Sequence, residues 1–177
     1  RVVRLNKEVY VDGIDGDLIG EGINAALRER GLPEKTFILL NDTVAPMLGG
    51  VASTMDKTYD SHIGYILGTG TNTCYMEDCA NVLKSPDIAG MSGQMAINME
   101  SGGFDRIAQG GIDRALESAT AAPGKQVMEK MISGYYQGTV IHRTVQAATG
   151  RGLFSPAFAA SLALLDDFTM YDIDQFC

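Results

Sequence analysis

The first forty residues alternate between segments with strand and helix periodicity. Residues 3–11 partly alternate between apolar and polar side chains, which predicts a strand. From Ile19 onward an apolar residue recurs at every fourth position, which predicts a helix that Asp17 caps and that ends near Arg30. Residues 36–40 form an apolar run, which is typical of a strand buried on both faces. The order strand, helix, strand predicts an α/β fold.

The middle of the chain combines one more helix with several strands. Pro46 fits only in the first turn of a helix, and this spacing makes Thr43 the expected N-cap residue. Residues 62–77 place a glycine-rich turn between two strand-like stretches, which predicts a β-hairpin. Residues 94–100 predict a further strand.

The last third of the chain is predicted to be mainly helical. From Pro123 onward the apolar residues recur at helical spacing, although Gly134 and Gly138 weaken this helix midway. A further helix is expected over residues 155–168. Residues 169–172 begin with threonine and end with aspartate, the spacing of a weak capping box that opens one more helix.

Composition narrows the classes of function. The chain has 177 residues, 45% apolar and 20% charged, which is typical of a globular protein that buries a core without disulfides. A formal net charge of -8 without Lys/Arg clusters argues against nucleic acid and acidic membranes as partners. No apolar stretch approaches the roughly 20 residues that span a bilayer. Three widely spaced cysteines favour a reducing compartment over a disulfide framework.

The first candidate for chemistry is the Asn41-Asp42 step, which directly follows the apolar run of residues 36–40. Ligands of open α/β sheets bind beyond the carboxyl ends of the strands. A carboxylate at that edge can accept a proton from a substrate hydroxyl. The alternative is that Asp42 only turns or caps the chain at the start of the next helix. The spacing alone leaves both interpretations open.

Other polar clusters are equally open to two interpretations. The turn at residues 68–72 is rich in glycine and threonine, so its backbone could approach a phosphate, or it could be a plain hairpin turn. No lysine follows it in the register of a Walker A loop. Gln126 and Glu129 are expected on one face of a helix, and Asn98 and Glu100 on one face of a strand. Each pair could form a binding site or a solvated face.

The histidines and cysteines carry weaker signals. His62 and His142 are isolated in the sequence, which favours structural or exposed roles over catalysis. Cys74 and Cys79 lack the partner ligands that a zinc site requires. No metal-ligating residues are therefore predicted.

Taken in order, four motifs resemble the hexokinase family. They are N-D-T-V at 41–44, G-T-G-T-N-T-C-Y-M-E at 68–77, I-N-M-E at 97–100 and P-G-K-Q-V-M-E-K-M-I-S-G at 123–134. The resemblance covers nearly the whole chain. It implies an α/β fold of the actin-like ATPase (ribonuclease H-like) type, in which two lobes close over a sugar. Residues 1–41 would be the C-terminal part of the small lobe and residues 42–177 the first part of the large lobe.

The resemblance also implies a role for each cluster. Asp42 corresponds to the general base that acts on the 6-hydroxyl of the sugar. The family uses ATP together with Mg²⁺, and the turn that contacts the ATP phosphates corresponds to Gly68, Thr69, Gly70 and Thr71. The residues that bind the sugar, or support those that do, correspond to Asn6, Lys7, Asn41, Asn72, Glu100, Gln126 and Glu129.

The implied function is the ATP-dependent phosphorylation of a hexose, with glucose expected, in the cytoplasm. Three positions depart from the usual family motifs, namely Asn6, Pro46 and Ser101. The departures at Pro46 and Ser101 motivate an alternative, a hexokinase-like sugar-binding or regulatory protein without turnover. The family's first phosphate loop, its serine-containing sugar loop and its adenosine-binding segment are not found in these residues. Flanking segments are therefore expected to be missing, and the fragment alone is expected to be inactive.

Overall fold

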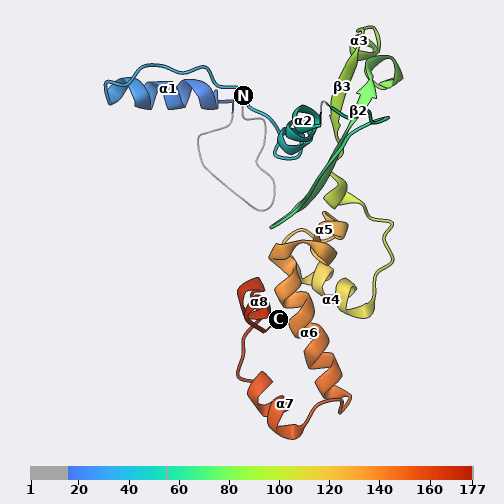
Figure 1. The fold of residues 1–177 in the computed structure, drawn as a ribbon. Helices are drawn as coiled ribbons and strands as arrows, with labels where there is room; N and C mark the ends of the chain where they lie inside the picture. Colours follow the sequence, from blue (N-terminus) through green and yellow to red (C-terminus); the bar gives the residue numbers. More distant parts are fainter. Residues whose placement is uncertain (1–15, 55, 177) are drawn as a thin grey trace. The chain divides into compact units, whose positions relative to one another are not determined.

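A computed structural model of the chain describes residues 16–54 and 56–176 (Figure 1). The chain divides into two compact units, Arg1–Leu40 and Asn41–Cys177. The strand expected at residues 3–11 lies outside the described residues. The assignment of the two units to the two lobes of a kinase stays a prediction.

The first unit contains one described helix, α1, which spans Ile19–Glu29. Its N-cap is Leu18, which has no side-chain acceptor, so the prediction that Asp17 caps the helix is wrong. Asp17 lies one residue too early for its carboxylate to take that position. The helix ends in a Schellman motif with Gly31 at a φ of 67°, a conformation that glycine adopts without strain.

The apolar segment at residues 36–40 is not a strand, contrary to the prediction. The chain runs back along α1, where Lys35 exchanges two hydrogen bonds of 2.9 and 3.0 Å with the side chain of Asn24. Phe37 packs against Gly20, whereas Ile38 is 82% exposed. A strand requires a neighbouring strand for its backbone hydrogen bonds, and no described residue of this unit provides one.

The second unit is built around an antiparallel sheet in the order β1-β2-β3. The strands are β1 (Ile63–Leu67), β2 (Thr71–Asp78) and β3 (Gln94–Asn98). The hairpin predicted at residues 62–77 is confirmed, and so is the strand predicted at 94–100, although β3 ends two residues earlier. A short 3-10 helix, η1 (Cys79–Asn81), and α3 (Pro86–Ala89) connect β2 to β3 (Figure 1).

Helix α2, Val44–Ser53, packs on the hairpin at Gly64. A Cβ atom on Gly64 would lie 2.5 Å from the carbonyl oxygen of Thr43 and 2.9 Å from Cβ of Met47, so only glycine permits this approach. Pro46 is the third helical residue, which confirms its place in the first turn. Thr43 occupies the N-cap position, but its side chain makes no capping hydrogen bond.

The remaining chain is helical. The helices are η2 (Ser101–Gly103), α4 (Gly111–Ala119), α5 (Val127–Ile132), α6 (Gly134–Gly150), α7 (Pro156–Leu162) and α8 (Met170–Phe176). The single helix predicted after Pro123 is wrong, because Ser133 is extended and separates α5 from α6. The predicted capping box is confirmed: the N–H of Thr169 donates to Asp172 over 2.8 Å, and the N–H of Asp172 donates back over 3.2 Å.

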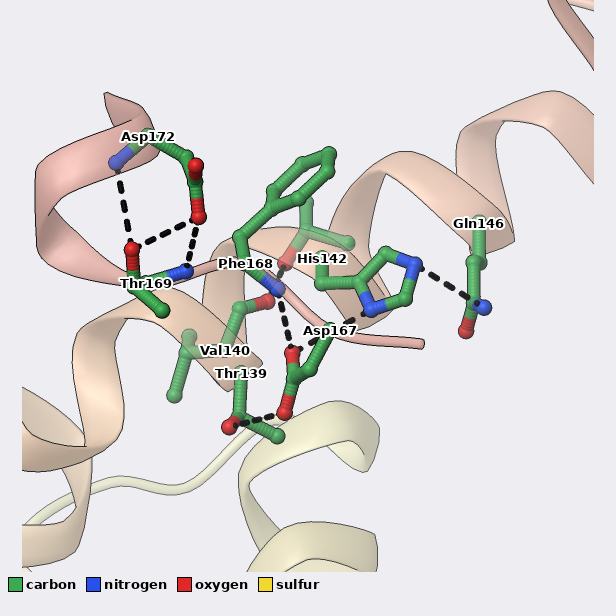
Figure 2. Close-up of polar contacts among 9 residues, drawn as sticks. Thr139, Val140, His142, Gln146, Asp167, Phe168, Thr169 and Asp172 are labelled. Carbon is green, nitrogen blue, oxygen red and sulfur yellow. Dashed lines mark hydrogen bonds and ion pairs between the residues drawn. The ribbon is translucent and has the colours of Figure 1, made fainter. Parts of the chain in front are cut away.

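The helix predicted over residues 155–168 ends earlier, at Leu162, and Asp167 beyond it binds α6 (Figure 2). Its carboxylate accepts hydrogen bonds from Thr139 Oγ1 at 2.6 Å and His142 Nδ1 at 3.2 Å. The N–H of Phe168 donates to the same carboxylate over 2.8 Å. His142 is only 3% exposed, and its ring lies 4.7 Å from that of Phe168. This histidine therefore has a packing role.

Gly138 lets the segment before α8 approach α6. A Cβ atom on Gly138 would lie 1.9 Å from the carbonyl oxygen of Phe168, so the backbone of that segment would have to move. We expect Gly138→Ala to destabilise the protein by about 1–3 kcal/mol in urea unfolding. Gly150 of the same helix faces open space, and Gly150→Ala should be neutral or stabilising. Equal stability of the two variants would contradict this packing.

The Asp167 cluster should also make stability depend on pH. Burial acts to raise the pKa of Asp167, but the hydrogen bonds from Thr139, Phe168 and His142 outweigh it and hold the pKa below 3.8. A carboxylate whose pKa is lowered by folding contributes stability above its unfolded pKa and loses it as pH falls through the folded pKa. Asp167→Asn should therefore be less stable than wild type at neutral pH, with a gap that closes below about pH 4.

The matched control for this variant is Asp174→Asn, which changes an exposed carboxylate on α8. It should leave stability unchanged across the same pH range. A gap between Asp167→Asn and wild type that stays constant from neutral to acid pH would argue against this role for the carboxylate.

Candidate active site

The turn between β1 and β2 is fixed by contacts on several sides. The N–H groups of Gly134 and Tyr135, at the start of α6, donate to the carbonyls of Gly68 and Thr69 over 2.7 and 3.3 Å. The N–H of Thr71 donates to Oε2 of Glu129 over 2.9 Å. The N–H groups of Thr69 and Gly70 donate to no described residue. The turn is therefore a braced loop with two backbone donors that an anion could accept from.

Glu129 is the centre of this bracing. It is the third residue of α5 and is only 4% exposed, whereas its sequence position also allowed a solvated first turn. A buried carboxylate is costly unless it is hydrogen-bonded, and the positive end of the helix dipole adds support. The bond to Thr71 joins residues 58 positions apart.

Gln126 lies outside the helix, contrary to the prediction that it shares a helical face with Glu129. It precedes α5 with φ 52° and ψ 42°, the left-handed conformation. Both side chains nevertheless approach η2 at the same residue, Gly102. A Cβ atom on Gly102 would lie 2.8 Å from Oε1 of Gln126, 3.0 Å from the carbonyl of Thr71 and 3.1 Å from Cβ of Glu129.

Asn98 and Glu100 do not share a strand face as predicted, because β3 ends at Asn98 and Glu100 is left-handed. Their side chains are nevertheless hydrogen-bonded, together with a residue of β2. Nδ2 of Asn98 donates to Oε1 of Glu100 over 2.9 Å. Nδ2 of Asn72 donates to Oδ1 of Asn98 over 2.7 Å and to Oε1 of Glu100 over 3.3 Å. Oδ1 of Asn72 accepts from the N–H groups of Thr73 and Ser101. These hydrogen bonds connect β2, β3 and η2.

Backbone strain is concentrated in this region. Among the described residues, Glu100 and Gln126 are the two non-glycine residues with positive φ, each at 52°. The left-handed conformation costs a residue with a side chain about 1–2 kcal/mol. Such strain persists where surrounding contacts enforce it, and it clusters at functional sites.

The structure distinguishes the two interpretations of Asp42, a residue that turns or caps the chain and an exposed carboxylate. Asn41 performs the local turn: its Oδ1 accepts from the N–H of Thr43 at 2.9 Å, and its carbonyl accepts from the first N–H groups of α2. The carboxylate of Asp42 stays exposed, with a contact of 3.4 Å from Thr43 Oγ1. Asp42 is therefore available to a ligand.

This step lies on the sheet close to the other polar residues. The thiol of Cys74 donates to the carbonyl of Thr43 over 3.3 Å. Cys74 and Asn72 are two apart on β2, and Asn98 pairs with Cys74 across the sheet, so the three side chains share one face. The Asp42 segment therefore packs on the face that carries Asn72.

The structure thus brings together Asn72, Glu100, Gln126, Glu129 and the turn at residues 68–71, and it places Asn41 and Asp42 on the same face of β2 as Asn72. Asn6 and Lys7 lie outside the described residues. Sequence reasoning missed Gly102, whose only signal was its place in a glycine pair.

Residues 16–54 and 56–176 contain no group of three or more His, Cys, Asp or Glu able to hold a metal. Within that same part of the chain, no helix is long and apolar enough to cross a membrane.

Solved structures place this arrangement in the actin-like ATPase fold class, which confirms the fold prediction. A hexokinase from Schistosoma mansoni complexed with glucose matches with a TM-score of 0.64 at 27% identity, over 84% of this chain and 33% of its own. A second hexokinase structure matches with a TM-score of 0.60 at 29% identity, over 76% of this chain and 28% of its own.

Sequence comparisons agree. The family model described as Hexokinase matches residues 62–175. Hexokinase-1 of Solanum tuberosum is 32% identical over 177 residues, which are 98% of this chain and 34% of that protein. Hexokinase-2 of Oryza sativa subsp. japonica is 34% identical over 149 residues, 81% of this chain and 29% of that protein. The chain belongs to the hexokinase family, and it spans about a third of the length of these relatives.

The packing of Gly102 against α5 gives a direct test of the site's geometry. Gly102→Ala should destabilise the protein by about 1–3 kcal/mol, because the added Cβ forces Gln126 and the Thr71 carbonyl apart. Gly103 is the matched control, because a Cβ there meets Gln126 only at an ordinary 3.9 Å. Thermal unfolding should separate the two variants. Similar melting temperatures for both would show that η2 does not pack as described.

Proposed function

We propose that the complete protein is an ATP-dependent hexose kinase that phosphorylates the 6-hydroxyl of glucose or a close relative. The observation that carries the proposal is the convergence of the strained Glu100 and Gln126 with Asn72 and the buried Glu129. Each sugar hydroxyl both donates and accepts hydrogen bonds, so a hexose site needs carboxylates and amides together. Membership in the hexokinase family supports the same reaction class.

In the proposed reaction Asp42 is the general base. Its exposed carboxylate accepts the proton of the 6-hydroxyl while that oxygen attacks the γ-phosphorus of ATP, and the bond to the ADP oxygen breaks. The sugar would be held by Asn41, Asn72, Glu100 and Glu129, with Gln126 in support. Asn6 and Lys7, which lie outside the described residues, stay predicted sugar contacts.

The braced turn is the proposed contact for the phosphates of ATP. The N–H groups of Thr69 and Gly70 point to an anion-binding role, because no described residue accepts from them. When bound, Mg²⁺ neutralises part of the negative charge on the ATP phosphates. Magnesium commonly binds through one or two carboxylates and the phosphates themselves, so such a site would not require a group of three or more protein ligands, and the described residues contain none.

The same residues support binding without turnover as the second candidate. Ser101, which departs from the usual family motif, forms a hydroxyl pair with Thr73 at 2.9 Å. Pro46, the second departure, follows Asp42 by four positions and lies in the first turn of α2, which tolerates proline. We propose the cytoplasm as the location, and we expect the 177-residue chain alone to show little turnover, since it spans about a third of its relatives.

A coupled assay of ADP release by the complete protein, with glucose titrated by calorimetry, tests the proposal. Asp42→Asn should lower kcat by about 10²–10⁴-fold, the usual contribution of a general base, and leave glucose affinity within about tenfold. Asp60→Asn, which changes an exposed carboxylate outside the site, is the control and should retain full activity. Wild-type kcat in Asp42→Asn would exclude the base role, and glucose binding without ADP release in wild type would favour the second candidate. A wild-type protein that binds no hexose contradicts both candidates.

A further inference from the structure

Asn98 lies between two members of the proposed hexose site, although the function above gives it no role. Its Nδ2 donates to Oε1 of Glu100 over 2.9 Å, and its Oδ1 accepts from Nδ2 of Asn72 over 2.7 Å. It is the last residue of β3, and it pairs across the sheet with the fully buried Cys74. Asn98 therefore connects the end of a paired strand to an exposed carboxylate.

The orientation of Glu100 depends on such a connection. Its backbone is in the left-handed conformation and its side chain is exposed, so neither helix nor core packing restricts it. Oε1 accepts from Asn98 and, more distantly, from Asn72, while Oε2 accepts from no described residue. Fixing a glutamate side chain before binding removes an entropic cost that the ligand would otherwise bear.

We propose that Asn98 is a positioning residue: it holds Oε1 of Glu100 from the end of β3, so that Oε2 is presented to a hydroxyl of the hexose. This inference rests on the proposed function and assigns Asn98 no contact with the sugar. Asn98 acts through Glu100, which is the property that distinguishes it from a sugar ligand or from a residue needed only for folding. Sites carried by strands and held by such supporting hydrogen bonds are more precise than sites on free loops.

The test uses the complete protein and glucose titrated by calorimetry, which measures binding whether or not turnover occurs. Asn98→Ala should weaken glucose binding about tenfold, the effect of losing one hydrogen bond to a charged group. In an active enzyme KM should rise by a similar factor while kcat changes little, because the interaction serves binding and transition state alike. Asn98→Asp should weaken binding at least as much, because it sets a second carboxylate against Glu100.

The decisive variant exchanges donor and acceptor. In Asn98→Asp/Glu100→Gln the amide of the new glutamine can donate to the new carboxylate, so the pair is restored with reversed polarity. Glu100→Gln alone gives the reference affinity. We expect the double variant to bind glucose within about threefold of Glu100→Gln, so that the loss caused by Asn98→Asp disappears. The effects of Asn98→Asp and Glu100→Gln on glucose affinity would then not add. A residue that only supports folding, or that contacts the sugar itself, is not expected to give this result.

Asn81→Ala is the matched control, because Asn81 makes the same kind of hydrogen bond, 2.8 Å to Oε1 of Glu77, outside the site. It should leave glucose affinity unchanged, and thermal unfolding checks that every variant folds. If wild type binds glucose and the losses of Asn98→Asp and Glu100→Gln add, the inference is overturned while the proposed function stands. If Asn98→Ala binds like wild type, the inference is likewise overturned. If wild type binds no hexose, the proposed function and this inference both fail.

Discussion

The candidate site depends on one buried hydrogen bond, which runs from the backbone N–H of Thr71 to the carboxylate of Glu129. Glu129 is almost completely buried, so its carboxylate has to be hydrogen-bonded within the protein. The bond joins the first residue of β2 to the first turn of α5. In the hairpin turn just before β2, the carbonyl of Gly68 accepts a hydrogen bond from the start of α6. Sheet and helices therefore meet at the loop proposed to face the phosphates of ATP.

The close packing of backbones explains how polar side chains from several elements converge although few apolar side chains of the described residues are buried. Gly64 allows the chain after Asn41 to rest on β2, and Gly102 allows η2 to reach α5. In both places a single methyl group would force backbone atoms or site side chains apart. The contacts on either side of η2 then hold Glu100 and Gln126 in a backbone conformation that an isolated peptide avoids.

Local features were predicted from the sequence, whereas features that depend on distant partners were not. The hairpin at residues 62–77 and the capping box at Thr169 follow from turn and cap chemistry within a few residues, so the pattern was sufficient. The apolar run at 36–40 has the composition of a strand, but only a neighbouring strand could make it one. The helix expected after Pro123 was divided because the start of α6 binds the loop at Gly68.

The candidate site shows the same contrast between features set by nearby residues and features set by distant partners. Motif order and spacing pointed to Asn72, Glu100 and Glu129. Alternation predicted a shared strand face for Asn98 and Glu100, whereas the two are joined by a hydrogen bond across the left-handed turn that follows β3. The left-handed backbone of Gln126 had no sequence signal; its side chain packs closely against Gly102, which is 24 positions away in the sequence. The bond between Thr71 and Glu129 spans 58 positions and could not be inferred from periodicity.

The central claim is that this polar cluster is a hexose site, and a crystal structure of the complete protein with glucose tests it most directly. The account predicts glucose on the face of β2 that carries Asn72. Its hydroxyls should lie within hydrogen-bond distance of Asn72, Glu100 and Glu129, with the 6-hydroxyl at the carboxylate of Asp42. Glucose bound elsewhere, with no hydroxyl near these side chains, would contradict the account.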